Sequence, residues 1–408
     1  MASFFGLAVA AMSIIWGAAS AAAQQPAGQV VKLGEGETLT ISGFINATIF
    51  TDRGLFGSFG QGQNAEWAAA PANQPATDKM FTDADVRNTR INFTFNAPAV
   101  LGKWAPRAVL ESDFFAPLTL VPPFQDEQPA LRVRFAYVDL TNGRTTVRIG
   151  QFWSPLFGEV PVSVTHLAFP LGYGATGMVG WRFPGVFLYH DLTSGKPVNV
   201  QLQLAAFKGS GPFTAGNARD STNNIGNGEA SGLPQLEARL NFAKRTPKLS
   251  WSGYVVGHID WKDTTGTGVT GDKNLTAWGF EAGFNVAPSK FTLHGNFYYG
   301  KDLGQQFAHI TQTVRKIRGW GAWAQAGYDF DPHWGLWFYY GMDQPNAQRY
   351  ATETGLTLAR QLNHDADALL RFRAGRYALG LEYFRAVTRF NTGPASADQV
   401  ALSVLYTL

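Results

Sequence analysis

The sequence predicts an all-β protein, a 16-stranded antiparallel transmembrane β-barrel with short periplasmic turns and long outer loops. Three observations support this prediction. Short segments alternate apolar and polar residues, and alternately short and long connections join them. The final segment, 400–408, keeps the alternation up to the last residue, with Val400, Leu402 and Val404 on one face.

Residues 1–23 predict a cleaved export signal. They carry no charged side chain, and the alanines before Gln24 fit the small-residue pattern of a signal-peptidase site. The alternative is an uncleaved anchor, but the apolar run Phe4–Trp16 is shorter than the roughly 20 residues that a membrane-spanning helix needs. Because no linker or change of composition follows, we expect residues 24–37 to form a short periplasmic segment and residues 38–408 to form the barrel.

The composition excludes several classes of protein. Only 15% of the residues are charged, and the mean hydropathy of -0.11 fits strands that are apolar on one side. No second stretch approaches 18 consecutive apolar residues, so membrane-spanning helices are not expected. The net charge of +3 gives no argument for nucleic acid. With no cysteine, a lipid anchor on cysteine and disulfides are both excluded.

Strands in the first half of the chain have apolar residues at every second position. The clearest covers 90–96, where Ile91, Phe93 and Phe95 alternate with polar residues. The Asn142-Gly143 pair signals a tight hairpin. The least regular segment is 179–191, after a long apolar stretch. The predicted strands of this half cover 38–50, 90–96, 104–114, 131–138, 147–150, 179–191 and 198–204.

Strands in the second half follow the same rule. The segment 235–242 sets Leu236, Ala238 and Leu240 against Gln235 and Arg239. The predicted strands of this half cover 235–242, 249–261, 275–286, 291–299, 319–330, 333–342, 366–373, 376–388 and 399–408.

The lengths of the connections predict which end of the barrel faces the periplasm. We expect long and short connections to alternate strictly from the first strand to the last, and the even number of strands to place both termini in the periplasm. The predicted long connections cover 51–86, 115–130, 151–178, 208–234, 262–274, 300–318 and 343–365.

The polar faces decide between a barrel and a sandwich. A sandwich would place its charged faces outside, whereas a barrel can hold charged residues in a wet lumen. Charged residues occupy the middle of many strands, among them Arg107, Glu237, Arg239, Glu281 and Glu382. Aromatic residues near strand ends, such as Trp104, Trp278, Tyr299, Tyr340 and Tyr383, suit interfacial girdles.

Three stretches carry a family resemblance. Arg132–Val138 with Arg148–Pro155, Ala378–Tyr383, and the C-terminal strand resemble Gram-negative outer-membrane porins. Glu111–Phe115 and the Gly-Gln-Phe-Trp-Ser-Pro run are similar in particular to the DcaP-type trimeric porins, which take up dicarboxylates. The resemblance implies an outer-membrane homotrimer, in contact with outer-membrane lipid and lipopolysaccharide, that passes small hydrophilic solutes.

In porins the third outer loop folds inward, so the resemblance implies an inward-folded third loop that faces arginines and forms the constriction. In the third long connection only Glu159 and His166 carry an acidic or basic side chain. Guanidinium groups bind carboxylates bidentately, so a wall of arginines would favour anions. The alternative is that the arginines pair with lumen carboxylates as structural ladders. The predicted pore-lining residues are Arg90, Arg107, Glu111, Asp113, Arg132, Arg134, Arg148, Glu159 and His166.

Other motifs give weaker signals. The GxGxxG match at 172–177 lies in no strand–helix unit, and the seven histidines lack metal-ligand spacing, so no catalytic residue, cofactor or metal is expected. Arg315, Lys316 and Arg318 form a basic cluster that either binds lipopolysaccharide phosphates or is simply solvated. Passive diffusion with a weak anion preference is the predicted function. A substrate-specific carboxylate channel, a barrel enzyme and an adhesive surface protein are the alternatives.

Overall fold

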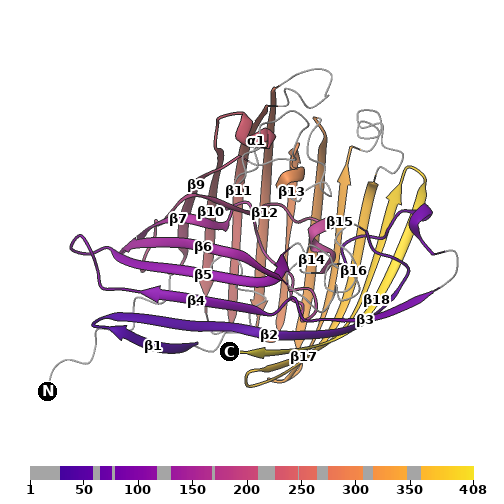
Figure 1. Cartoon of the computed structure of the whole chain (residues 1–408), viewed down its shortest axis with the longest axis horizontal. Coiled ribbons are helices and arrows are strands. Elements are labelled where there is room, and N and C mark those ends of the chain that lie inside the picture. Colours follow the sequence, from indigo (N-terminus) through magenta and orange to yellow (C-terminus); the bar gives the residue numbers. More distant parts are fainter. Residues whose placement is uncertain are drawn as a thin grey trace.

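Backbone pairing between the first and last long strands closes the sheet on itself (Figure 1). In the computed structural model, β2 (Glu37–Arg53) pairs antiparallel with β18 (Gly393–Thr407), and every other pairing joins strands close in sequence. The closed sheet of sixteen antiparallel strands predicted from the sequence is confirmed within the described residues. These are 28–57, 65–75, 79–116, 130–167, 171–209, 226–246, 248–263, 274–306, 316–346 and 360–408. The predicted export signal, residues 1–23, and Arg315 lie outside them.

The other strands follow one another around the barrel. They are β3 (Met80–Asp85), β4 (Arg90–Asn96), β5 (Ala105–Ala116), β6 (Ala130–Asn142), β7 (Thr145–Trp153), β8 (Arg182–Asp191), β9 (Asn199–Phe207), β10 (Gln235–Arg245), β11 (Leu249–Asp263), β12 (Asn274–Pro288), β13 (Phe291–Lys301), β14 (Arg318–Asp329), β15 (Trp334–Pro345), β16 (Arg360–Ala374) and β17 (Tyr377–Phe390). Within the described ranges, short helical pieces lie in connections: η2 (Pro71–Asn73), η3 (Leu171–Ala175), α1 (Asn227–Ala230) and η4 (Gly304–Gln306). No helix of the described part is long and apolar enough to cross a membrane.

Each strand separates an apolar outer face from a polar inner one. On β17, Leu379, Leu381 and Tyr383 point outward and are exposed, whereas Glu382 and Phe384 point inward and are buried. The same alternation recurs around the barrel, so large apolar side chains cover its outer surface. An exposed apolar surface of this extent is what a bilayer covers, and a polar interior is typical of outer-membrane barrels.

The second barrel strand is divided into two pieces. β3 pairs with residues 48–53 of β2, and β4 pairs with residues 38–44. β3 lies inside the stretch predicted to be a loop. A turn interrupts them: Asp85 accepts hydrogen bonds from the backbone and guanidinium of Arg87, and the Thr89 N–H donates to the Val86 carbonyl. Met80–Asp85 has no regular apolar alternation, which is why the sequence pattern missed it.

The N-terminal segment contains one further strand. β1 (Gln29–Gly34) pairs with residues 38–41 of β2, on the edge of β2 that β18 occupies farther along. The N–H of Leu408 donates to the Gly43 carbonyl, so this strand and the C-terminus meet at one rim (Figure 1). We call it the short-turn rim, because it also holds the tight turns 143–144, 289–290 and 375–376.

A β-bulge at Arg134 reverses the faces of the residues after it. The ladder skips Arg134, because Val133 and Phe135 pair with consecutive residues of β5. Val133 faces outward as predicted. Phe135 and Tyr137, predicted to share that face, turn into the lumen instead, where their rings contact Phe152. The prediction was wrong here because a bulge adds one residue to the period of two.

The opposite rim, which we call the long-loop rim, has one exception to the predicted alternation. β17 and β18 are joined by residues 391–392 alone, and Phe390 pairs directly with Gly393. Pro394, Ala395 and Ala397 extend β18 to this turn. These small residues, and a proline without an N–H donor, do not show the apolar alternation of a strand, so the sequence predicted a longer connection.

Candidate functional site

The third long connection folds into the lumen, as predicted, and lumen side chains hold its backbone. The carboxylate of Glu237 on β10 accepts the Leu156 N–H at 2.7 Å. Gln325 on β14 binds both sides of Val162: its oxygen accepts the N–H at 2.6 Å, and its nitrogen donates to the carbonyl at 2.8 Å. Buried backbone groups need such partners, because no water reaches them. We call residues 154–181 the inward loop; 168–170 lie outside the described residues.

The far end of the inward loop is fixed to the opposite wall. The Thr165 N–H donates to Glu382 on β17 at 2.9 Å, and its carbonyl accepts from Asn88 at 2.6 Å. The Val164 carbonyl accepts from Asn46 on β2 at 3.2 Å. The loop therefore crosses the lumen from β10 to β17 and β2.

The first long connection also enters the lumen. Ala65 and Ala68 pack against Phe384 on β17 and Ala397 on β18, and the Ala68 N–H donates to Thr388 at 3.0 Å. It also meets the inward loop, since a Cβ added to Gly174 would lie 2.8 Å from the Glu66 carboxylate. Together the two loops cover the inner wall formed by β16 to β18.

Glu66 is a buried carboxyl group at this contact. Its burial, reinforced by the nearby charge of Asp365, raises the pKa of Glu66 well above its usual range, although backbone N–H groups of Gly174 and Ala175 oppose the shift. Asp365, Asp367 and Glu382 also point inward and are buried. Carboxyl groups thus line the wall that the loops cover.

Arg90, Arg132 and Arg134 lie together on the side of the lumen formed by β4 to β8, and we call this group the arginine wall. Arg134 is buried at the bulge and bridges two carboxylates of β5, Glu111 and Asp113, each at 2.8 Å. Arg132 binds Asp113 bidentately at 2.9 and 2.6 Å. Arg134 therefore makes structural ion pairs with Glu111 and Asp113, which is the arrangement predicted as the alternative.

Arg90 joins this wall to the inward loop. Its Nε lies 3.7 Å from the Glu111 carboxylate, and its Nη2 donates to the Leu167 carbonyl at 3.2 Å. The side chains of Arg90 and Arg132 are 17% and 20% exposed, against 3% for Arg134. Arg90 and Arg132 are therefore the more exposed side chains of this group.

Arg148 does not belong to this surface. It is buried and binds Asp139 bidentately at 2.7 and 2.9 Å. Its guanidinium lies 3.8 Å from the ring centre of Tyr137 and 3.9 Å from that of Phe152. Arg107 lies opposite Asp139 in the ladder between β5 and β6 and is partly exposed.

Arg182, the first residue of β8, was not among the residues predicted to line the pore. Its guanidinium lies over the rings of Trp153 and Trp181, at 4.8 and 4.5 Å, and the positive charges of Arg134 and Arg132 repel it. It is buried, yet its Nε and Nη1 donate no hydrogen bond within the described residues. Because Arg182 lies in the least regular predicted segment, no alternation marked its direction.

With Arg182, positive charge exceeds negative charge on this wall. The arginines at 90, 132, 134 and 182 outnumber the carboxylates of Glu111 and Asp113. Such an excess attracts anions, most strongly where water is partly excluded.

The two titratable groups of the inward loop turn away from the arginines. The carboxylate of Glu159 lies 3.4 Å from the amide nitrogen of Asn285 and 3.8 Å from a ring nitrogen of His294. His166 is fully buried, its ring 5.4 Å from that of Phe384. The structure therefore places neither on the arginine wall. Among the described residues, no group of three His, Asp or Glu is arranged to hold a metal.

Comparison with known proteins supports the fold. The sequence matches no family model and no curated protein. The structure is similar to the outer-membrane channel DcaP of Acinetobacter baumannii, with a TM-score of 0.68 and 18% identity over 94% of this chain and 100% of that one. It is also similar to an anion-selective porin from Comamonas acidovorans, with a TM-score of 0.55 and 12% identity over 91% and 100% of the two chains. A trimer form of OmpT from Vibrio cholerae gives a TM-score of 0.54 and 12% identity over 91% and 99%. The predicted likeness to porins, and to DcaP in particular, is confirmed at the level of the fold.

Proposed function

We propose that this protein is an outer-membrane porin through which small hydrophilic solutes diffuse passively, with a preference for anions such as carboxylates. The single observation that carries the proposal is the course of the inward loop. Its backbone is anchored to β10, β14, β17 and β2. The partly exposed Arg90 and Arg132 lie on a different part of the inner wall, on β4 and β6. The polar passage inside an apolar outer surface then runs beside the arginines.

Two physical effects would act on a solute in this passage. The inward loop narrows the lumen and excludes large solutes, since a barrel of sixteen strands is otherwise wide enough for an aqueous channel. The excess of guanidinium groups lowers the energy of anions relative to cations. Arg90 and Arg132 can donate hydrogen bonds to a passing carboxylate without leaving their own partners, Glu111 and Asp113.

A substrate-specific carboxylate channel is the second candidate function. The observation that favours it is Arg182, whose Nε and Nη1 donate no hydrogen bond within the described residues. A buried guanidinium held between Trp153 and Trp181 is preorganised to bind an anion rather than only to attract one.

We also propose a homotrimer embedded in outer-membrane lipid. The exposed apolar outer face supports contact with lipid. The trimer form of the Vibrio cholerae protein, which has the same fold, supports the assembly. Chemical cross-linking of the purified protein in detergent tests it, and a single monomer band would contradict it.

Planar-bilayer recording tests the channel and its selectivity. We expect stepwise single-channel currents, and in a salt gradient a reversal potential whose sign indicates anion preference. Currents with a reversal potential of the opposite sign would refute the anion preference but retain the porin. A folded protein that inserts without currents would refute the porin itself.

A further inference from the structure

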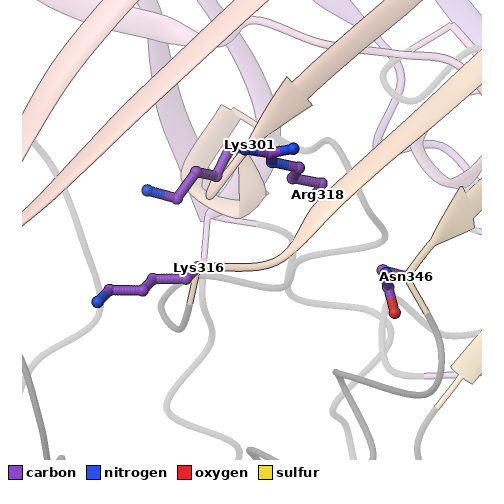
Figure 2. A pocket seen from close by; sticks show the side chains of 4 residues that line it. All are labelled: Lys301, Lys316, Arg318 and Asn346. Carbon is purple, nitrogen blue, oxygen red and sulfur yellow. The ribbon is translucent and has the colours of Figure 1, made fainter.

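A basic pocket lies at the long-loop rim, at the ends of β13 to β15. Its volume is about 400 Å³, and it is lined by Lys301, Lys316, Arg318 and Asn346 (Figure 2). Lys301 ends β13, Arg318 begins β14, and Asn346 follows β15, so three neighbouring strands supply the lining. In Figure 2 the Lys301 and Lys316 side chains extend in the same direction. A volume of this size is in the range of small-ligand sites.

The lining carries more positive than negative charge. Lys301 lies 3.7 Å from the carboxylate of Asp302 and donates to the Thr276 carbonyl at 3.2 Å. Asp302 is itself buried, and its other carboxylate oxygen accepts the Ile317 N–H at 2.9 Å. Among the described residues, the three cations of the lining have one neighbouring carboxylate, an arrangement suited to a phosphate, which accepts hydrogen bonds from both lysine and arginine.

The pocket belongs to the outward face of the barrel. Lys301 and Arg318 are paired in register between β13 and β14. On β13 the inward residues Tyr298 and Gly300 are buried, whereas Tyr299, two positions before Lys301, faces outward and is exposed. A ligand in this pocket would therefore sit on the outer wall and not in the passage.

Aromatic residues lie just below the pocket on the same face. Tyr299 contacts Trp278, at 5.6 Å between ring centres, and Trp320 contacts Phe297 at 6.2 Å. Two residues along a strand cover about 7 Å, so the aromatic residues begin about 7 Å from the cations. Aromatic residues at this level are typical of the membrane–water interface. A free phosphate would use only the cations, whereas a phosphorylated lipid would also use this apolar surface.

From the charge, the outward direction and the aromatic surface below, we propose that Lys301, Lys316 and Arg318 bind the phosphate groups of an outer-leaflet glycolipid, whose acyl chains lie along β13 and β14. The inference rests on the proposed function in one respect, that the long-loop rim faces outward from the cell. It specifies residues for the predicted contact with lipopolysaccharide.

Native mass spectrometry of the detergent-solubilised protein tests the site. The probes are a diphosphorylated lipid A, the same glycolipid after phosphatase treatment, and inorganic phosphate as competitor. The test variant is Lys301→Gln with Lys316→Gln and Arg318→Gln. The control is Lys196→Gln with Lys244→Gln and Lys248→Gln, which removes three positive charges near the short-turn rim.

We expect the test variant to bind diphosphorylated lipid A at least about tenfold more weakly than wild type, and the control to bind as wild type does. Wild type should bind the dephosphorylated lipid weakly. Equal binding by the test variant, or an equal loss in the control, would overturn the proposal. Displacement of the lipid by millimolar inorganic phosphate would overturn the lipid assignment in favour of a free-phosphate site.

Two further measurements keep the result interpretable. If the triple variant does not fold, as judged by its heat-dependent mobility in gel electrophoresis, the single variant Arg318→Gln replaces it, and unchanged binding by that variant would count against the site. Single-channel conductance of the same preparation is expected to be unchanged. A loss of lipid binding with intact conductance separates this site from the channel, and absent currents in wild type would refute the porin while leaving the binding result in place.

Discussion

The side-chain amide of Gln325 binds both backbone polar groups of Val162: its oxygen accepts the N–H at 2.6 Å, and its nitrogen donates to the carbonyl at 2.8 Å. The amide therefore supplies the two backbone hydrogen bonds that a neighbouring strand would otherwise make with Val162. This contact lies between the two ends of the inward loop, where Val162 also packs against Trp337 and Leu369.

Substitution Gln325→Leu should loosen the inward loop. It leaves the N–H and carbonyl of Val162 without partners, at a cost of about 1–3 kcal/mol for each buried group. We expect a lower midpoint of thermal unfolding and larger, noisier single-channel currents. The control is Gln344→Leu, an exposed outward position on β15. Unchanged conductance would show that this contact does not set the width of the passage.

Removing the two exposed wall arginines should shift ion selectivity. In Arg90→Gln with Arg132→Gln, Glu111 and Asp113 lose part of their compensating charge, and the local excess of positive charge is removed. The reversal potential in a salt gradient should move toward cation preference. The control is Arg144→Gln with Lys196→Gln, which removes the same charge from exposed turns. An equal shift in both variants would place the selectivity in the overall charge and not in the wall.

Arg148 should matter for stability and not for selectivity. In Arg148→Met the buried Asp139 loses both of its hydrogen bonds, and breaking a buried pair in this way costs about 3–5 kcal/mol. Urea unfolding in detergent should show this loss, while the reversal potential stays at the wild-type value. The exposed Arg144→Met is the matched control. A clear change of reversal potential would return Arg148 to the pore-lining residues.

Arg182 distinguishes a general porin from a carboxylate channel. If its guanidinium binds carboxylates, adding succinate should block wild-type currents transiently, and Arg182→Gln should shorten or abolish these blocks. Arg182→Lys keeps the charge but not the planar fork, so it should restore selectivity more fully than blocking. Identical blocks in wild type and Arg182→Gln would leave only the general porin.

Glu66 should make the packing of the first long connection depend on pH. Because burial raises its pKa in the folded protein above the usual 4.5, the folded state binds the proton more tightly than the unfolded state. The contribution of Glu66 is therefore most favourable below about pH 4.5 and declines as the pH rises through the folded-state pKa. Hydrogen-exchange protection of the Ala68 N–H, corrected for intrinsic rates, should fall over that range in wild type. Glu66→Gln should lose this dependence, and a variant that keeps it would assign the titration to another group.

Local chemistry was enough to predict most of the strands, although not β1 or β3. The alternation of Leu379, Leu381 and Tyr383 with Glu382 is a property of a few adjacent residues, and it predicted both β17 and its outward face. The pattern failed where one added residue changed the period, at Arg134, and where small residues replaced apolar ones, at Ala395 and Ala397. Neither feature has a distinctive composition.

The arginines show the same division. The sequence identified Arg90, Arg132, Arg134 and Arg148 as inward residues, and all four point into the barrel. Which of them faces the passage depends on partners that are distant in sequence. Arg148 is buried because Asp139 accepts its hydrogen bonds and the ring of Tyr137 lies against its guanidinium. Arg90 instead donates a hydrogen bond to the Leu167 carbonyl of the inward loop.

A closed barrel of sixteen strands and its apolar outer face could be predicted from local patterns, because a period of two and the lengths of the connections are local properties. The inward third loop was implied by the resemblance to porins. The crossing of the inward loop to β17, the turn of Glu159 and His166 away from the arginines, and the place of Arg182 beside them became visible only in the folded chain. These positions follow from hydrogen bonds and ion pairs between residues far apart in the chain, which no local pattern encodes.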